Sequence, residues 1–297
     1  QNSSIPADGL NIRLPDTPQD QEKRMHESKI DAVRTFCRKN KLDKIIWNGF
    51  KAKIGIISLG KSYLDTRLAL DELGINESNV ENFCLRLYKV AMPWPLEKQG
   101  ILEFVKGLEL VIVVEEKRAL IEYQIKEILF DSKINLTVIG KKDENGNHLF
   151  FSSGALDTNQ IALSIGKRIL NIKNSIDLKQ RLLEIESRLK PLKLSEKVLQ
   201  RFPYFCSGCP HNTSTVVPEG SIAMAGIGCH YMVQWMDRGD TIGFTQMGGE
   251  GANWIGQAPF INRKHVFQNI GDGTYYHSGI LAIRAAVASG VNITYKI

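Results

Sequence analysis

The ten residues LELVIVVEEK (Leu108–Lys117) decide the predicted fold class. Their apolar run is continuous, which is typical of a strand buried on both faces of a parallel sheet. The next residues, 119–130 (ALIEYQIKEILF), have the apolar spacing of an amphipathic helix. A buried strand followed at once by a helix indicates an α/β domain.

The same alternation of strand and helix extends on both sides of this stretch. The expected elements are a strand at 53–60 (KIGIISLG), a helix at 61–74, a strand at 85–96 that runs into a proline-rich loop, and a strand at 134–142. This order predicts a mostly parallel sheet that helices cover on both faces. Glu115 and Glu116 end the central strand, where a sheet usually meets a ligand or another domain, and we expect a contact with another domain there.

Helical segments flank this α/β unit. A helix over Glu22–Asn40 would place Met25, Val33 and Cys37 near one face, with Cys37 as a small core residue. Residues 156–200 are helical and charged, with one apolar stripe that stops before Pro191. The expected division is a helical lead-in at 1–50, an α/β domain at 51–150, a helical connector at 151–200 and a second, glycine-rich α/β domain at 201–297.

Composition narrows the class of protein. The chain has 297 residues, 43% of them hydrophobic, and a formal net charge of +6. Basic and acidic residues interleave between Lys167 and Arg201, which favours a solvated helical face over a nucleic-acid patch. No apolar run approaches the ~20 residues that span a bilayer. The chain begins without methionine and stops within an apolar run, so we expect a segment of a longer polypeptide.

Five cysteines are too few, and odd in number, for a disulfide framework, so a reducing, cytoplasmic compartment is expected. Three of them, Cys206, Cys209 and Cys229, cluster near "CSGCPH" and "GIGCH". The CxxC spacing lets two sulfurs bind one metal or one cluster. By spacing alone, iron–sulfur and zinc are equally compatible, with His211 or His230 as further zinc ligands. A redox dithiol and unligated thiols remain as the other readings.

A second motif, "VFQNIGDGTYYHSG" (266–279), has the order strand, GDG, helix start. The carboxylate of Asp272 between two glycines suits a divalent metal that neutralises a diphosphate, because glycines allow the backbone to approach phosphate oxygens. A plain turn explains the same three residues equally well.

Taken together, "CSGCPHNTS", "GIGCHYM", "TQMGGEGANWIGQAPF" and residues 265–297 resemble the 2-oxoacid:ferredoxin oxidoreductases, and among them the long, fused bacterial indolepyruvate ferredoxin oxidoreductases. Upstream, "GKSYLDTRLALDELGI", "RLYKVAMPWPLE" and "VIVVEEKRALIEYQIKE" resemble the transketolase C-terminal-like domain of that family. The resemblance implies a transketolase C-terminal-like domain with a parallel or mixed sheet at 51–150. The first part of a thiamine diphosphate-binding α/β domain would follow at 201–297.

The resemblance also implies a set of site residues. The ligands of a [4Fe-4S] cluster would be Cys206, Cys209 and Cys229, with the fourth cysteine further along the polypeptide. The residues that border thiamine diphosphate would be Ile227, His230, Gly249 and Glu250. The residues at magnesium and the diphosphate would be Asp272, as the metal ligand, with Gly271, Gly273 and Thr274. The second magnesium ligand would lie beyond Ile297, and the glutamate that activates the cofactor would lie upstream of Gln1.

The implied reaction is the oxidative decarboxylation of an aryl 2-oxo acid, indolepyruvate, to an arylacetyl-CoA. Electrons would pass through the cluster to ferredoxin, with coenzyme A as acyl acceptor. His211 could donate a proton near the cofactor or have a structural role. The resemblance further implies a homodimer that needs its other domains for activity. The alternatives are the same chemistry on pyruvate or a branched-chain 2-oxo acid, a non-redox thiamine-dependent decarboxylase, and a zinc-stabilised interaction module.

Overall fold

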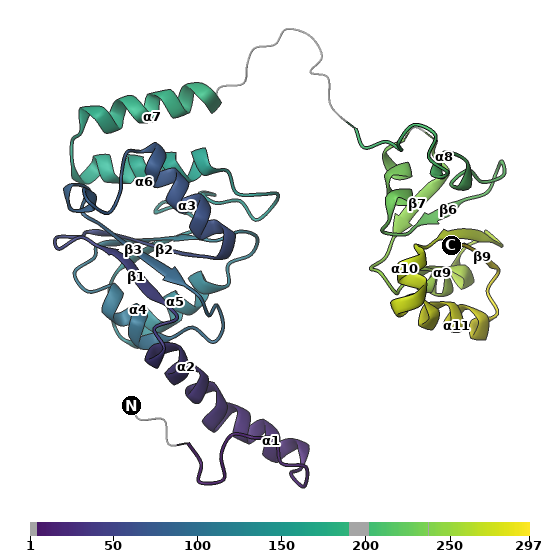
Figure 1. The fold of residues 1–297 in the computed structure, drawn as a ribbon, viewed down its shortest axis with the longest axis horizontal. Helices are drawn as coiled ribbons and strands as arrows, with labels where there is room; N and C mark the ends of the chain where they lie inside the picture. The colour runs from purple at the N-terminus through teal and green to yellow at the C-terminus, as the bar shows by residue number, and fades with distance from the viewer. Residues whose placement is uncertain (1–4, 190–201, 237) are drawn as a thin grey trace. The chain divides into compact units, whose positions relative to one another are not determined.

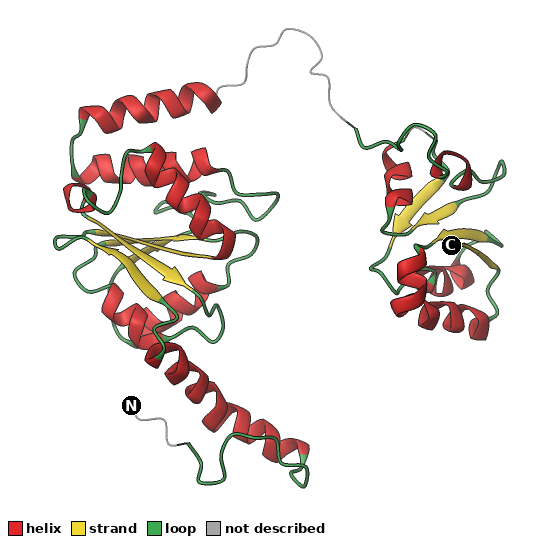
Figure 2. Ribbon diagram, in the orientation of Figure 1, coloured by secondary structure: helices red, strands yellow, loops and turns green. Residues whose placement is uncertain are grey.

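The computed structural model describes residues 5–189, 202–236 and 238–297. They form two compact units, Gln1–Lys193 and Leu194–Ile297 (Figure 1). Both units combine β-sheets with helices, which confirms the predicted α/β class (Figure 2). In the part of the chain that is described, no helix has the length and apolarity needed to cross a membrane.

The first unit is built on a five-stranded sheet in the order β1-β3-β2-β4-β5. Its strands are β1 (Lys44–Asn48), β2 (Ile54–Leu59), β3 (Leu85–Val90), β4 (Leu110–Val114) and β5 (Thr137–Ile139). All neighbours pair in parallel except β1, which runs antiparallel to β3 at the edge of the sheet. Every residue of β4 after Leu110 is buried, as the continuous apolar run of this strand predicts.

Helices cover both faces of this sheet (Figure 1). The covering helices are α3 (Gly60–Glu72), α4 (Lys98–Phe104), α5 (Ile121–Asp131), α6 (Thr158–Ile172) and α7 (Ile176–Leu189), with a short 3₁₀ turn at Val80–Phe83. One apolar core lies between the sheet and the helices α3, α6 and α7, and a second lies between the opposite face of the sheet and the helices α4 and α5. The helices expected as a connector therefore add buried side chains, such as Ile165 and Leu182, to the first unit. The expected helix end at Pro191 lies outside the described residues.

A continuous helical segment precedes the sheet. It consists of α1 (Pro18–Arg24), a π-helical turn (Met25–Lys29) and α2 (Ile30–Lys39). It extends away from the sheet in Figure 2. Cys37 is buried, but Met25 and Val33 are 47% and 42% exposed. The predicted core position of Cys37 is confirmed, whereas Met25 and Val33 on the same face stay exposed, because only the last turn of the helix reaches the sheet-bearing part of the unit.

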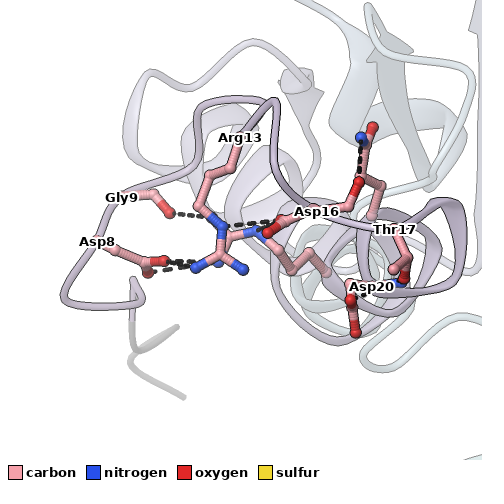
Figure 3. Close-up of polar contacts among 8 residues, drawn as sticks. Asp8, Gly9, Arg13, Asp16, Thr17 and Asp20 are labelled. Atoms are coloured by element: carbon pink, nitrogen blue, oxygen red, sulfur yellow. Dashed lines mark hydrogen bonds and ion pairs between the residues drawn. The ribbon is translucent and has the colours of Figure 1, made fainter.

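Polar contacts hold the loop before α1 against the helix (Figure 3). Arg13 pairs with the carboxylates of Asp8 and Asp16, and Arg24 donates to the carbonyl of Gly9 at 2.8 Å. Asp8 and Arg13 are exposed, so the ion pair between them contributes little to stability, whereas Asp16 and Arg24 are half-buried. The helix itself begins at a Thr17 cap, whose hydroxyl accepts the Asp20 backbone N–H at 3.2 Å.

The second unit is built on a four-stranded parallel sheet in the order β7-β6-β8-β9. Its strands are β6 (Ala223–Ala225), β7 (Thr241–Phe244), β8 (Val266–Asn269) and β9 (Ile293–Lys296). Its helices are α8 (His211–Ser214), a 3₁₀ segment (Cys229–Trp235), α9 (Ala252–Gln257), a 3₁₀ turn (Ala258–Phe260), α10 (Asp272–Thr274), a π-helical turn (Tyr275–Gly279) and α11 (Ile280–Ser289). The chain moves from β6 outward to β7, then returns to place β8 on the other side of β6. The strand order therefore reverses between β6 and β8.

Candidate functional site

The reversal of strand order brings two glycine-rich loops together in the second unit. Gly226 directly follows β6, and Gly271 is the second residue after the end of β8. A side chain at Gly226 would begin 2.6 Å from the Asn269 carbonyl oxygen and 2.5 Å from a ring carbon of His230. Only glycine fits this contact. In open α/β sheets, ligands bind outside the carboxyl ends of strands at such a reversal, so this edge is the candidate site.

The GDG residues form the start of a long helical segment. Gly271 is the extended residue before α10, and no side chain caps the free backbone N–H groups there. Asp272 is exposed, and Thr274 is buried. Open space lies over the two glycines: a side chain at Gly273 would meet nothing within 4 Å, and one at Gly271 only Thr274 at 3.9 Å. An exposed carboxylate beside uncapped N–H groups fits a diphosphate neutralised by a divalent metal.

The CxxC residues form a tight, well-braced turn. The backbone N–H of Cys209 donates to the Cys206 carbonyl at 3.0 Å, and Gly208 supplies the left-handed φ of +73°. The Asn212 amide donates to the carbonyls of Cys206 and Cys209 at 3.3 and 3.1 Å. The thiol of Cys206 is exposed and that of Cys209 is half-buried. This turn is suited to presenting two sulfurs to one ligand.

Two histidines connect the CxxC turn to the loop after β6. Nδ1 of His211 lies 3.1 Å from the Cys209 sulfur, and its ring centre lies 6.1 Å from that of His230. His230 is 7% exposed, and neither of its ring nitrogens has a hydrogen-bond partner among the described residues. Burial lowers the pKa of His230, so its ring is held neutral. The two histidines thus bring the CxxC turn close to the segment that carries Cys229.

The three cysteines do not form a ligand set in this structure. Cys206, Cys209 and Cys229 are all free thiols. Among residues 5–189, 202–236 and 238–297, no three His, Cys, Asp or Glu side chains lie together so that they could hold a metal ion. The predicted cluster and magnesium ligands therefore stay predictions.

Glu250 is completely buried in the loop after β7. Its Oε2 accepts the Gly248 backbone N–H at 2.7 Å, whereas Oε1 has no hydrogen-bond partner in the described part of the chain. Tyr295 donates its hydroxyl to the Glu250 carbonyl at 3.0 Å, and burial followed by the Glu250 charge raises the pKa of Tyr295. A buried polar oxygen without a partner is costly, so Glu250 is a candidate for binding a missing group. Ile227, which was also predicted to border thiamine diphosphate, lies in the loop after β6 and is 38% exposed.

Comparison with known proteins identifies the first unit. Residues 44–191 match the model of the "Indolepyruvate oxidoreductase domain" family. These residues belong to that family. The indolepyruvate oxidoreductase domain thus begins with β1 and includes the five-stranded sheet, α6 and α7.

The similarity to known proteins extends beyond the indolepyruvate oxidoreductase domain. The chain is 29% identical over 262 residues to "Indolepyruvate oxidoreductase subunit IorA" of Pyrococcus horikoshii, covering 82% of this chain and 37% of the relative. It is 31% identical over 245 residues to the protein of the same name from Archaeoglobus fulgidus, covering 79% and 35%. The chain thus spans about a third of the length of these relatives.

A solved structure, "2-oxoglutarate:ferredoxin oxidoreductase from Magnetococcus marinus with 2-oxoglutarate, coenzyme A and succinyl-CoA bound", is 16% identical. The match covers 52% of this chain and 24% of that chain, with a TM-score of 0.37.

Within the indolepyruvate oxidoreductase domain, Glu115 caps a helix. Its buried carboxylate accepts the backbone N–H groups of Leu120, Ile121 and Glu122 at 3.0 to 3.1 Å, at the start of α5. Glu116 accepts the N–H of Leu156 and pairs with Lys61. Both acids therefore have partners inside their own unit. The contact with another domain expected there stays a prediction.

Two residues that the sequence did not single out brace the candidate site. Gln268 and Asn269 end β8 and are 1% and 3% exposed. The Gln268 amide donates to the carbonyls of Met224, Ala225 and Asn269 at 3.3, 3.3 and 2.9 Å, across the end of β6. Asn269 donates to Met224 at 3.4 Å. A polar pair at the end of an apolar strand, just before GDG, is the signal that could have identified them.

Proposed function

We propose that the chain is part of an enzyme that oxidatively decarboxylates an aryl 2-oxo acid, indolepyruvate, and transfers the acyl group to coenzyme A. The observation that carries this proposal is the contact between Gly226 and Asn269, which brings the loop after β6 beside the GDG loop after β8. The relatives named as indolepyruvate oxidoreductase subunits support the substrate class. The same chemistry on pyruvate or a branched-chain 2-oxo acid is the alternative.

Thiamine diphosphate with Mg²⁺ is the cofactor that these residues fit. Asp272 would bind the metal, and the backbone at Gly271, Gly273 and Thr274 would approach the diphosphate, because the glycines leave open space there. When bound, the cofactor would supply a carbon nucleophile for the 2-oxo group and an electron sink for the bonding pair that departing carbon dioxide leaves behind.

The protein's own residues would control orientation and protons around this cofactor. His230, whose pKa is lowered by burial and whose ring nitrogens have no side-chain hydrogen-bond partner among the described residues, would accept a proton or donate one there. His211 lies between His230 and Cys209, so it could relay a proton or hold both groups in place. Glu250 would use its free Oε1 to orient a hydrogen-bond donor. Burial of these groups strengthens each such interaction.

A [4Fe-4S] cluster held by Cys206, Cys209 and Cys229 would accept electrons for ferredoxin. The CxxC turn and the exposed Cys229 support this part of the proposal. Among the described residues the three sulfurs do not converge into one ligand set. The homodimer and the cytoplasmic location are part of the same proposal, and few, unpaired thiols support a reducing compartment.

The test uses the protein at its full native length, purified without oxygen and supplied with thiamine diphosphate, Mg²⁺ and coenzyme A. We expect iron and sulfide in the protein, and a visible absorption band that bleaches when indolepyruvate is added. Asp272→Asn should abolish bleaching and thiamine diphosphate binding without removing iron. Its matched control is Glu219→Gln, an exposed acid that precedes β6 and so lies toward the opposite edge of the sheet.

The other outcomes are equally informative. A colourless protein that holds zinc would overturn the cluster. If the protein holds iron but its absorption bleaches only with pyruvate or a branched-chain 2-oxo acid, that acid is the substrate in place of indolepyruvate.

A further inference from the structure

A cavity of about 480 Å³ lies in the first unit, between the end of α2, the turn into β1, β3 and α4. Its volume is in the range of small-molecule sites. One side of the cavity lies near the carboxyl end of β3. There Asp43 Oδ1 accepts the backbone N–H groups of Ala91 and Met92, the two residues after the strand, at 2.7 and 3.1 Å. None of the residues proposed for the thiamine site belongs to this unit.

The wall of the cavity contains a polar group that lacks a partner. Tyr88 is 3% exposed, and its hydroxyl forms no hydrogen bond with the described residues. It reaches the space beside Gly100 in α4, where any side chain would collide with the Tyr88 oxygen. Glycine at position 100 is therefore required for the Tyr88 hydroxyl to lie against α4. Burial raises the pKa of Tyr88, which keeps the hydroxyl protonated.

The charged groups around the cavity fall into a paired set and an unpaired set. Glu97, 2% exposed, accepts from Arg38 at 2.7 and 2.9 Å and from the backbone of α4, so this pair satisfies itself. Lys41, in the turn after α2, and Lys44, the first residue of β1, are exposed side chains that line the cavity without an ion pair among the described residues.

Two acidic residues, Asp43 and Glu103, also line the cavity. Glu103, exposed on α4, has no ion-pair partner among residues 5–189, 202–236 and 238–297, and Asp43 Oδ2 has no N–H or O–H donor there, although the Cys37 thiol, which also lines the cavity, interacts with the Asp43 carboxylate. Asp43 and Glu103 line the cavity together with Tyr88, and after burial the charges of Asp43, Glu97 and Glu103 raise the pKa of Tyr88. A cavity with two unpaired ammonium groups and two incompletely satisfied carboxylates is complementary to a ligand that carries both charges.

We propose that this cavity binds a free amino acid with an apolar side chain. The ligand's carboxylate pairs with Lys41 and Lys44, its ammonium group donates to Asp43 and Glu103, and its side chain packs against Ile45. Tyr88 provides one further hydrogen bond. This inference does not depend on the proposed function.

The test is a calorimetric titration of the 297-residue chain with L-phenylalanine, 3-phenylpropionate and 2-phenylethylamine. The last two keep the ring but each lacks one charge. We expect saturable binding of L-phenylalanine and binding weaker by roughly tenfold or more for both analogues, since each loses a charge-assisted hydrogen bond. The titration needs no cofactor and no electron acceptor, so its result is separate from that of the bleaching experiment.

Variants locate the binding. Lys44→Met, Glu103→Gln and Tyr88→Phe should each weaken L-phenylalanine binding, by roughly tenfold for the two charge changes. The controls Lys51→Met and Glu127→Gln, which remove exposed charges outside the cavity, should leave it unchanged. Absence of saturable binding, equal affinity for the three compounds, or equal binding by Lys44→Met and the parent would each overturn the proposal.

Discussion

The carbonyl oxygen of Asn269 lies 2.6 Å from the point where a side chain at Gly226 would begin. Asn269 ends β8 and Gly226 follows β6, so this contact joins the two loops proposed to hold the cofactor. The ring of His230 closes the same space from the other side. The geometry of the candidate site therefore depends on the absence of one side chain.

Gly226→Ala should disrupt this junction. The added methyl group overlaps the Asn269 carbonyl and the His230 ring. Because the Asn269 carbonyl is part of the backbone, it cannot move aside as easily as the end of a flexible side chain. We expect a loss of about 1–3 kcal/mol in the free energy of unfolding of the second unit. Urea denaturation followed by circular dichroism would measure it. Gly256→Ala is the matched control, because a side chain in α9 at that position meets nothing within 4 Å. Equal stability of both variants would contradict the prediction.

Glu250→Gln should stabilise the cofactor-free chain while impairing activity. The side-chain carbonyl of glutamine can still accept the Gly248 N–H, and the variant removes a completely buried carboxyl group with one unpartnered oxygen. We expect a gain of about 1 kcal/mol in unfolding free energy. Thermal melting without cofactor measures the gain, and the full-length enzyme measures the lost activity. A less stable variant would show that Glu250 serves the fold itself.

Glu115→Ala should weaken the indolepyruvate oxidoreductase domain. Its carboxylate satisfies three backbone N–H groups at the start of α5, and without it these buried donors lose their acceptor. We expect a loss of about 1–3 kcal/mol in unfolding free energy. The control is Glu127→Ala, an exposed position on the same helix. If urea denaturation shows the same small effect for both, the cap is not a significant source of stability.

Cys37 should make the stability of the first unit sensitive to alkaline pH. Burial raises the pKa of its thiol from 9.0 to about 11, so the folded chain keeps the proton that the unfolded chain loses. Stability is then complete below pH 9.0 and falls as the pH rises toward 11, by about 1–2 kcal/mol. Urea denaturation at neutral and alkaline pH should show a smaller decrease for Cys37→Ala. An identical decrease in both proteins would assign the effect to other groups.

The thiols should also differ in reactivity. Cys206 and Cys229 are exposed and should react with a thiol reagent in the folded chain at neutral pH, whereas Cys37 should react only after unfolding. Mass spectrometry of the alkylated chain measures each position. Cys206 and Cys229 should be protected in the full-length protein if they bind a cluster there.

Parts of the fold follow from local patterns. The strand at Leu110–Val114 is buried on both faces, so its sequence is a continuous apolar run. The helix after it is buried on one face only, so its apolar residues recur at helical spacing. The helix before β1 shows the limit of this reasoning. Val33 has the helical spacing of a core residue yet is 42% exposed, because spacing shows which residues share a face but not what that face meets.

The candidate site was only partly predictable. Asp272 and the CxxC turn carry their chemistry in adjacent residues, so the motifs themselves point to metal and phosphate. The roles of Gln268 and Glu115 were not visible, since their hydrogen-bond partners are backbone groups, which every residue carries. The partners become specific only after the chain is folded.

The sequence by itself predicted the α/β class, the alternation of strands and helices around β4, and the CxxC and GDG motifs. These features depend on interactions between residues close in the chain. Only the tertiary structure decided that β8 pairs with β6 and so brings Asn269 and the His230 ring together around Gly226, and that Tyr88 and Glu103 line one cavity. Strand order is set by how apolar faces pack across the whole unit, and no local pattern of residues records that outcome.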